Sequence, residues 1–180
     1  YLPAWEKFGL FSLNCHNDEP TIRAYSMANY PAEGDVIMLT VRIATPPFKP
    51  KEQGGGFMDV NPGIASSYIF SLKPGDKVLM SGPYGEFRPQ YDSDREMIWV
   101  GGGAGMAPLR AQIMHMLKTL NVRTREMHYF YGARALEEVP FLNDFLELEK
   151  EYSNFHFHLA LDRTDPKADA AGIAYTPGFV

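Results

Sequence analysis

A short run near the amino terminus brings together three side chains with complementary chemistry. Arg23, Tyr25 and Ser26 fall within four consecutive positions. A guanidinium group gives bidentate hydrogen bonds to phosphate, and a tyrosine ring offers a flat, largely apolar surface. A serine hydroxyl both donates and accepts a hydrogen bond. On an extended strand Arg23 and Tyr25 point to one side and Ser26 to the other. The alternative is an ordinary strand with an exposed arginine and a half-buried tyrosine.

These three side chains match what a flavin dinucleotide requires of its site. The pyrophosphate needs positive charge, which Arg23 supplies, and the ring needs a flat cover, which Tyr25 supplies. The reactive N5 atom needs a small hydrogen-bonding partner that leaves room for hydride, which describes Ser26. We therefore predict that Arg23, Tyr25 and Ser26 bind FAD, with Tyr25 and Ser26 as the catalytic residues.

A second segment suits phosphate, namely Gly63-Ile64-Ala65-Ser66-Ser67. Glycine lets the backbone approach a pyrophosphate closely, and free N–H groups at a helix start attract anions. Serine is also a favoured helix N-cap, so a simple cap is the alternative. Capping and phosphate binding are compatible at one helix end.

A glycine-rich turn follows the apolar strand predicted at 97–100 and continues as Gly103-Ala104-Gly105-Met106-Ala107-Pro108. A helix is predicted from Pro108, whose missing N–H costs nothing at the first helical position. A glycine turn between a strand and a helix is the context in which such a motif indicates dinucleotide binding. A flavin motif followed by this turn predicts hydride transfer from a nicotinamide to a flavin.

The choice of nicotinamide nucleotide depends on Arg134, which follows the strand predicted at 127–131. This side chain suits the adenosine ribose or a 2′-phosphate, and it equally suits a solvated loop charge. Local chemistry therefore leaves NADH and NADPH both open.

The pattern of elements predicts two domains. Residues 1–94 are predicted to be mostly β, with strands at 36–44 and 77–81 rich in β-branched and apolar residues. Residues 95–180 predict a parallel βαβαβ unit, because short apolar strands alternate with amphipathic helices. Its strands are expected at 97–100, 127–131 and 155–161, and its helices from 108 and over 140–150.

Composition narrows the function classes. The 180 residues carry a net charge of −5 without a basic stripe, which disfavours a nucleic-acid partner. The single cysteine, Cys15, excludes an internal disulfide and a four-cysteine cluster within this chain. No metal site is expected, because His115, His128, His156 and His158 lack ligand spacing along the sequence. No signal peptide or membrane-spanning run is evident, so the chain itself is expected to be soluble.

The chain resembles the ferredoxin–NADP⁺ reductase superfamily through the motifs already described, together with Gly82-Pro83-Tyr84-Gly85-Glu86-Phe87. Within it, the chain is similar to the family of F subunits in bacterial Na⁺-translocating NADH:quinone reductases. Longer strings at 22–31, 41–47, 101–110 and 129–134 carry that closer likeness, which covers nearly the whole chain.

The resemblance implies a fold of class β plus α/β: an antiparallel flavin-binding barrel followed by a parallel-sheet nucleotide-binding domain. Both domains are expected to be incomplete here, with limits 1–94 and 95–180. The family's cluster domain, membrane anchor and C-terminal Cys-Gly-Pro segment do not occur in this sequence, so it is expected to be the central part of a longer protein. The implied cofactor contacts are Arg42, Ile43 and Ala44 near the FAD adenosine, Gly63, Ile64, Ala65, Ser66 and Ser67 at the pyrophosphate, and Gly103, Ala104, Gly105, Met106 and Pro108 facing NADH.

The resemblance also implies an activity: electrons pass from NADH to FAD, then to a [2Fe–2S] cluster outside this chain, and finally to quinone with Na⁺ export. The implied partners are the other subunits of a membrane complex at the cytoplasmic face of the bacterial inner membrane. Two alternatives remain open, namely a soluble reductase component of an oxygenase and a non-catalytic interaction module that keeps the fold.

Overall fold

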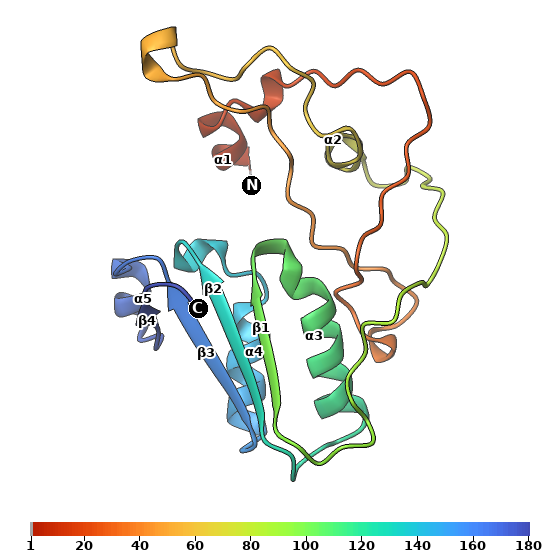
Figure 1. Ribbon diagram of the computed structural model, residues 1–180, viewed down its shortest axis with the longest axis vertical. Helices are drawn as coiled ribbons and strands as arrows, with labels where there is room; N and C mark the ends of the chain where they lie inside the picture. Colours follow the sequence, from red (N-terminus) through yellow and green to blue (C-terminus); the bar gives the residue numbers. More distant parts are fainter. Residues whose placement is uncertain (1) are drawn as a thin grey trace. The chain divides into compact units, whose positions relative to one another are not determined.

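The chain packs as two units in a computed structural model that describes residues 2–180 (Figure 1). Unit 1 comprises the described residues up to Tyr25 together with Val41–Pro83. Unit 2 comprises Ser26–Thr40 and Tyr84–Val180. Residues Ser26–Thr40 and 84–94, which precede the predicted limit at 94/95, pack within unit 2. The domain limits 1–94 and 95–180 stay a prediction.

A parallel sheet forms the centre of unit 2, with strand order β1-β2-β3-β4. Its strands are β1 (Met97–Gly102), β2 (Met127–Ala133), β3 (Phe155–Leu161) and the short β4 (Thr176–Pro177). This finding confirms the parallel α/β part of the predicted fold. The apolar strands form because the alternate side chains of each one enter a core on one face of the sheet.

Helices connect these strands. Helix α3 (Met106–Met114) follows β1 through the 3₁₀ turn η4 (Gly103–Gly105) and continues into a π-helical turn, η5 (His115–Thr119). After β2 come the 3₁₀ turn η6 (Leu136–Glu138) and helix α4 (Leu142–Glu151), and after β3 comes α5 (Pro166–Ala171). The chain moves from β1 to β2 to β3 across the sheet in one direction, and each connection is a right-handed crossover. Helices α3 and α4 therefore lie on the same face of the sheet (Figure 1).

The core of unit 2 lies between that face and the helices. Large side chains from the strands, α3, η5 and α4 are fully buried there, including Tyr129, Tyr131, Phe145, Ile113 and Leu117. On the strands, the residues that alternate with the buried ones point to the opposite face. Ile98 and Val100 lie on that face and are 60% and 63% exposed.

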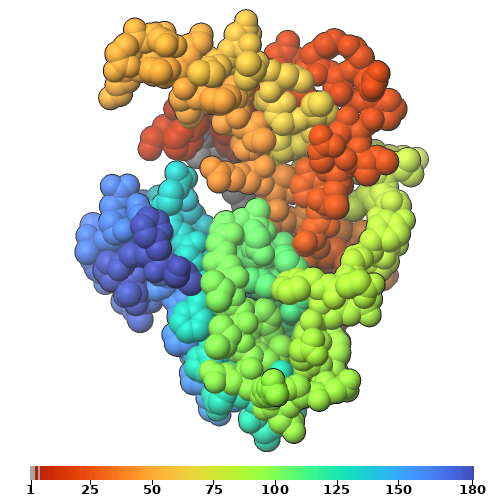
Figure 2. All heavy atoms as spheres, viewed as in Figure 1, coloured from red at the N-terminus to blue at the C-terminus, as the bar shows by residue number. Residues whose placement is uncertain are grey.

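The connection before β1 runs along α3 (Figure 2). On α3, Gln112 donates from Nε2 to the Phe87 carbonyl at 3.0 Å and accepts from the Trp99 indole at 3.0 Å. Arg125 donates to the carbonyls of Gln90, at 2.6 Å, and of Arg95. The connection before β1 has no secondary structure, so its backbone carbonyls lack the partners that a helix or strand would supply. Gln112 and Arg125 donate hydrogen bonds to three of them.

Unit 1 contains two helices and little other regular structure. Helix α1 (Leu2–Lys7) and helix α2 (Ile64–Ser71) are accompanied by the 3₁₀ turns η1 (Leu10–Ser12) and η3 (Lys51–Gln53). An aromatic contact joins the helices, because the Trp5 ring lies 5.3 Å from the Phe70 ring and 5.5 Å from Phe11.

The antiparallel barrel expected for residues 1–94 is not present in the part of the chain that the structure describes. The strands predicted at 36–44 and 77–81 do not form, and only isolated bridges occur, Met27 with Leu39 and Phe48 with Phe57. The segment 31–33 is instead the 3₁₀ turn η2 (Pro31–Glu33). A strand needs a ladder of partner hydrogen bonds, which β-propensity alone does not supply.

Among the helices described, none is both long and apolar enough to cross a lipid bilayer.

Candidate functional site

Backbone and side-chain hydrogen bonds join two of the predicted cofactor segments within unit 1. The Gly63 N–H donates to the Ala44 carbonyl at 2.8 Å. The Ala44 N–H donates to Ser66 Oγ at 3.1 Å, and that hydroxyl donates to the Gly63 carbonyl at 3.0 Å. A Cβ atom on Gly63 would lie 2.6 Å from the Ala44 Cβ and 2.8 Å from Ser66 Oγ, so only glycine fits this close approach.

The start of α2 has the features of an anion site. No side chain caps the helix at Gly63, so its first-turn N–H groups depend on another acceptor. The Ser67 Oγ is buried and has no hydrogen-bond partner among the described residues. A buried hydroxyl without a protein partner is free to bond to a ligand. A phosphate oxygen would satisfy both the hydroxyl and the N–H groups, so these residues fit the pyrophosphate of FAD.

The remaining predicted flavin residues are accessible. Arg23 is exposed and donates to the carbonyl of its neighbour Ile22 at 2.8 Å, and the Tyr25 ring is 36% exposed. Arg42 is exposed and Ile43 half-buried. No described hydrogen bond or ion pair joins Arg23 to the segment Gly63–Ser67, so their shared role at a pyrophosphate stays a prediction.

The glycine turn of unit 2 depends on close packing between backbone and side chains. A Cβ on Gly101 would lie 2.7 Å from the Leu109 Cδ1, and one on Gly102 would lie 3.1 Å from the Gly132 carbonyl oxygen. Gly103 has a φ of 55°, a left-handed conformation that favours glycine. The Tyr131 hydroxyl donates to the Gly103 carbonyl at 3.2 Å and so holds the turn.

This turn leads into α3 at the carboxyl end of β1, which is where open α/β sheets bind ligands. Gly103 and Gly105 are exposed, Ala104 and Pro108 are half-buried, and Met106 belongs to the core. No side chain caps α3 at Gly105. An exposed glycine backbone beside a helix start suits the pyrophosphate of NADH.

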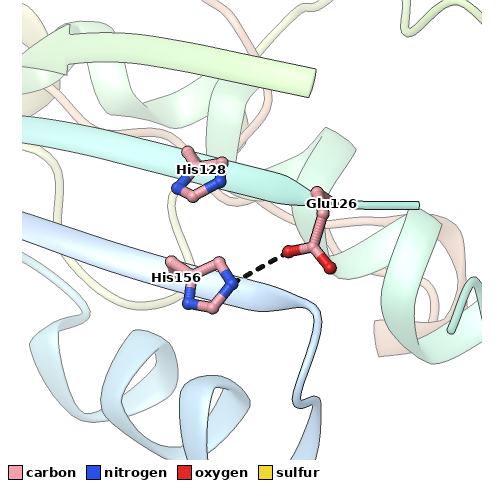
Figure 3. A group of neighbouring side chains, drawn as sticks. All are labelled: Glu126, His128 and His156. Carbon is pink, nitrogen blue, oxygen red and sulfur yellow. Dashed lines mark hydrogen bonds and ion pairs between the residues drawn. The ribbon is translucent and has the colours of Figure 1, made fainter. Parts of the chain in front are cut away.

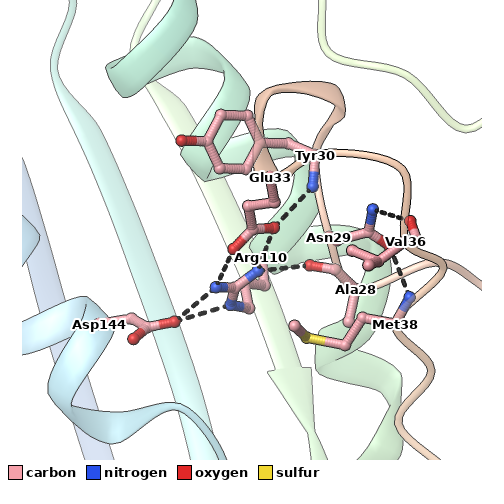
Figure 4. A network of polar contacts seen from close by, with 8 residues as sticks. All are labelled: Ala28, Asn29, Tyr30, Glu33, Val36, Met38, Arg110 and Asp144. Carbon is pink, nitrogen blue, oxygen red and sulfur yellow. Dashed lines mark hydrogen bonds and ion pairs between the residues drawn. The ribbon is translucent and has the colours of Figure 1, made fainter.

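A buried arginine that the sequence did not mark as functional lies one turn further along α3. Arg110 is 4% exposed and donates to two segments of unit 2, the stretch Ser26–Thr40 and helix α4 (Figure 4). Its Nη1 reaches the Ala28 carbonyl at 2.8 Å, its Nη2 reaches Glu33 Oε1 at 2.7 Å, and its Nε reaches Asp144 Oδ2 at 2.9 Å. Burial alone would lower the pKa of Arg110, but the hydrogen bonds to the two carboxylates raise it instead.

The same network shapes the segment that carries Ser26. Asn29 donates to the Val36 carbonyl at 2.8 Å and accepts from the Met38 N–H at 2.7 Å, while the Ala28 N–H donates to the Met38 carbonyl at 2.7 Å. These bonds close Ser26–Thr40 into a loop that Arg110 fastens to α3. Ser26 lies two residues before Ala28, so α3 anchors the backbone next to the predicted N5 partner.

Arg134 has a carboxylate partner in the structure. Its Nε and Nη2 atoms lie 2.9 Å from the two carboxylate oxygens of Glu138, four residues further on. Both side chains are largely exposed, at 71% and 45%. The hydrogen bond to Glu138 raises the pKa of Arg134. The sequence prediction missed Glu138, although its position four residues after an arginine was a usable signal.

Two family models match the chain in the expected order. The oxidoreductase FAD-binding domain matches residues 8–89 and the oxidoreductase NAD-binding domain matches residues 99–178. The F subunit of the Na⁺-translocating NADH-quinone reductase of Yersinia enterocolitica is 49% identical over 180 residues, and that of Klebsiella pneumoniae is 51% identical. Each alignment covers 100% of this chain and 41% of the relative, so the chain spans about two fifths of their length.

Solved structures show the same fold. A cytochrome P450 reductase from Amycolatopsis aligns with a TM-score of 0.62 at 28% identity, covering 86% of this chain and 41% of that one. The FAD/NAD-binding domain of a Vibrio cholerae nitric oxide dioxygenase aligns with a TM-score of 0.60 at 22% identity, covering 88% and 59%. The chain, with its FAD-binding and NAD-binding regions, therefore belongs to the ferredoxin–NADP⁺ reductase family of oxidoreductases.

Proposed function

We propose that this chain is the FAD- and NADH-binding part of an enzyme that moves hydride from NADH to FAD. The observation that carries the proposal is the start of α2, where no side chain caps the helix, the buried Ser67 hydroxyl has no partner, and Gly63 packs closely on Ala44 and Ser66. This arrangement lies within the residues matched by the FAD-binding family model.

Each predicted residue has a defined task in this reaction. The bound cofactors supply the redox chemistry, in which hydride passes from the nicotinamide C4 to the flavin N5. Gly63–Ser67 bind the pyrophosphate through N–H groups and hydroxyls, and Arg23 adds positive charge. Tyr25 covers the flavin ring, and Ser26 offers its hydroxyl at N5. The turn Gly103–Pro108 binds the nicotinamide nucleotide.

Arg110 is a positioning residue in this scheme. It fastens the loop that follows Ser26 to the helix that begins at the glycine turn. Because Ser26 must stay near the reacting atoms, a rigid loop reduces the entropy lost on reaching the reactive geometry.

The later steps are further proposals, supported by the names of the relatives, which are subunits of an NADH-quinone reductase. Electrons would leave FAD for a [2Fe–2S] cluster in another domain and reach quinone with Na⁺ export. The other subunits and the cytoplasmic face of the inner membrane belong to the same proposal, as does a flavin barrel completed in the longer protein.

A second candidate is a soluble reductase that passes electrons to an oxygenase. The likeness to a cytochrome P450 reductase at 28% identity favours it. The two candidates share the hydride step and differ in the acceptor. Quinone reduction by the NADH-reduced, full-length protein in its membrane complex would support the first, and reduction of a soluble oxygenase partner would support the second.

The hydride step is tested by adding NADH anaerobically to the FAD-loaded full-length protein and following the flavin absorbance. We expect bleaching faster than for free FAD. Bound FAD that NADH does not reduce would contradict the hydride step, and failure to bind FAD would favour a non-catalytic module.

The role of Ser26 is tested by Ser26→Ala in the same stopped-flow measurement. We expect flavin reduction to slow by about tenfold to a hundredfold, because a hydrogen bond at N5 is lost where charge develops. FAD retention should change little. Ser12→Ala removes an exposed hydroxyl that bonds only to the Gly9 carbonyl and is the matched control. Unchanged reduction kinetics in Ser26→Ala would remove Ser26 from the reaction.

A further inference from the structure

Imidazole side chains gather on the face of the sheet opposite α3 and α4. His128 on β2 and His156 on β3 are register partners in the parallel pairing of these strands. Both residues alternate with buried residues along their strands, so both point to the same, outer face. Their rings stack with centroids 4.7 Å apart.

A carboxylate completes the group (Figure 3). Glu126 immediately precedes β2, and its Oε2 atom lies 3.0 Å from the Nε2 atom of His156. One ligand atom from each of Glu126, His128 and His156 falls within 4.8 Å of the others. The side chains of the two histidines are 24% and 38% exposed and that of Glu126 is 56% exposed, so an ion can reach them from solvent.

Neighbouring groups orient the histidines, as outer-sphere partners do at metal sites. His128 Nδ1 lies 2.9 Å from His158 Nε2, and His128 Nε2 lies 3.2 Å from Glu96 Oε1. One of these contacts gives way when that nitrogen binds the ion, and the other then orients the ring. His158 is two residues beyond His156 on the same face, so it is a further nitrogen donor beside the group. Glu96 and Glu126 together supply the negative charge that balances a divalent cation.

We propose that Glu126, His128 and His156 form a binding site for Zn²⁺ or a similar late transition-metal ion. Two imidazole nitrogens and a carboxylate oxygen are ligands that Zn²⁺ accepts, and three protein ligands leave a fourth position for water or His158. Zinc bonds to nitrogen of about 2.0 Å place ligand atoms roughly 3.3 Å apart. The three ligand atoms therefore need only a rotamer adjustment to converge on one ion.

The site is separate from the nucleotide turn. Glu126, His128 and His156 lie at the amino-terminal ends of β2 and β3, whereas Gly103–Pro108 follow the carboxyl end of β1. An ion at this edge would cross-link β2 and β3 and stabilise unit 2 without touching the proposed hydride path. The proposal does not depend on the proposed function.

The test is a Zn²⁺ titration of the full-length protein, freed of any affinity tag and of bound metal, against a chromophoric chelator. We expect about one equivalent to bind, and His128→Ala and His156→Ala each to weaken binding by at least about tenfold. Co²⁺ should give visible absorption bands that the same variants lose. Zn²⁺ should raise the melting temperature of the wild type more than that of Glu126→Gln.

His16→Ala is the matched control. It removes an exposed histidine whose Nε2 lies 3.1 Å from an Asp18 oxygen. His16 is not one of the three residues of the proposed zinc site. We expect it to bind Zn²⁺ as the wild type does. Glu126→Gln changes an exposed side chain and is expected to fold. It therefore tests the site even if a histidine variant does not fold. Absence of saturable binding, or equal affinity in wild type, His128→Ala, His156→Ala and Glu126→Gln, would overturn the proposal.

Discussion

Arg110 is a buried charge that ties the loop after Ser26 to α3 and α4. Its guanidinium group is satisfied by a backbone carbonyl and a carboxylate from the loop Ser26–Thr40 and by a second carboxylate from α4. The Phe141 ring, 4.6 Å from its central carbon, covers one side of the group. Such a group is retained only where its hydrogen bonds are complete, because an unpaired buried charge is very costly.

Replacing Arg110 with methionine should lower the free energy of unfolding of unit 2 by about 3 kcal/mol, since two carboxylates lose their buried partner. Urea unfolding followed by tryptophan fluorescence measures the change, because Trp99 lies in this core. Arg134→Met, which breaks an exposed pair, should cost less than about 1 kcal/mol. Equal losses in the two variants would show that Arg110 is not a structural anchor.

Glu33 should make this network sensitive to acid. The hydrogen bond from Arg110 holds the pKa of Glu33 below its ordinary value of 4.5. Its contribution to stability is therefore fully present above that value and is lost as the pH falls through the lowered pKa.

In Glu33→Gln, whose side chain does not titrate, the stability should fall less steeply between about pH 5 and about pH 3. Urea midpoints measured across that range would show the difference. Glu52→Gln, which alters an exposed carboxylate of unit 1, should keep the wild-type slope. If the stability of Glu33→Gln fell as steeply with acid as that of the wild type, other carboxylates would account for the loss of stability at low pH.

At the scale of elements, the connection after β2 bears on the choice between NADH and NADPH. Arg134 lies just beyond the carboxyl end of β2, and the turn η6 brings Glu138 back to it. A guanidinium group paired with a carboxylate is less available to a 2′-phosphate, and the carboxylate repels that phosphate. This pairing therefore favours NADH.

Glu138→Gln should improve the use of NADPH relative to NADH by several-fold in kcat/KM, because Arg134 is released towards the 2′-phosphate. Steady-state kinetics with both nucleotides measure the ratio. Glu137→Gln is the control, since Glu137 pairs with Lys167 instead. The gain should vanish in an Arg134→Ala, Glu138→Gln double variant. If the ratio of kcat/KM for NADPH to that for NADH stayed unchanged in Glu138→Gln, the Arg134–Glu138 pair would have no role in the choice of nucleotide.

At the scale of the whole molecule, the two units differ in how their backbones are satisfied. The sheet of unit 2 pairs β2 on both sides, with β1 and β3. In unit 1 the segment 77–81 belongs to no ladder in the part of the chain that the structure describes. Amide groups protected by a central strand exchange slowly with solvent, and those outside ladders exchange quickly.

Hydrogen exchange without added cofactor should therefore show strong protection at Met127–Tyr131 and weak protection at 77–81. Mass spectrometry of peptic fragments gives both in one experiment. Strong protection at 77–81 would mean that the strand predicted there does form, as the family's barrel requires. Added FAD should slow exchange in 63–67 if the start of α2 binds the cofactor.

The sequence alone was sufficient for the α/β half and for the candidate nucleotide turn. Strands such as 97–100 and 127–131 and the glycine turn between strand and helix were predictable, because periodicity and turn chemistry are local properties. The alternating pattern of strands and helices then implies a parallel sheet. The same local reasoning failed at 36–44 and 77–81, where forming a strand depends on a partner segment that propensity does not specify.

Only the tertiary structure could bring together residues that are distant in sequence. Arg110 meets Glu33 across 77 positions, and the pairing of Ala44 with Gly63 and Ser66 spans about twenty. His128 and His156 carry no ligand spacing along the chain, and their proximity arises from the register of β2 and β3. Side-chain periodicity is set within one segment, whereas register and ion-pair partners are set by how the chain closes on itself. The sequence therefore determined the strand, turn and helix of the proposed nucleotide site, and the tertiary structure decided which charges and imidazoles meet.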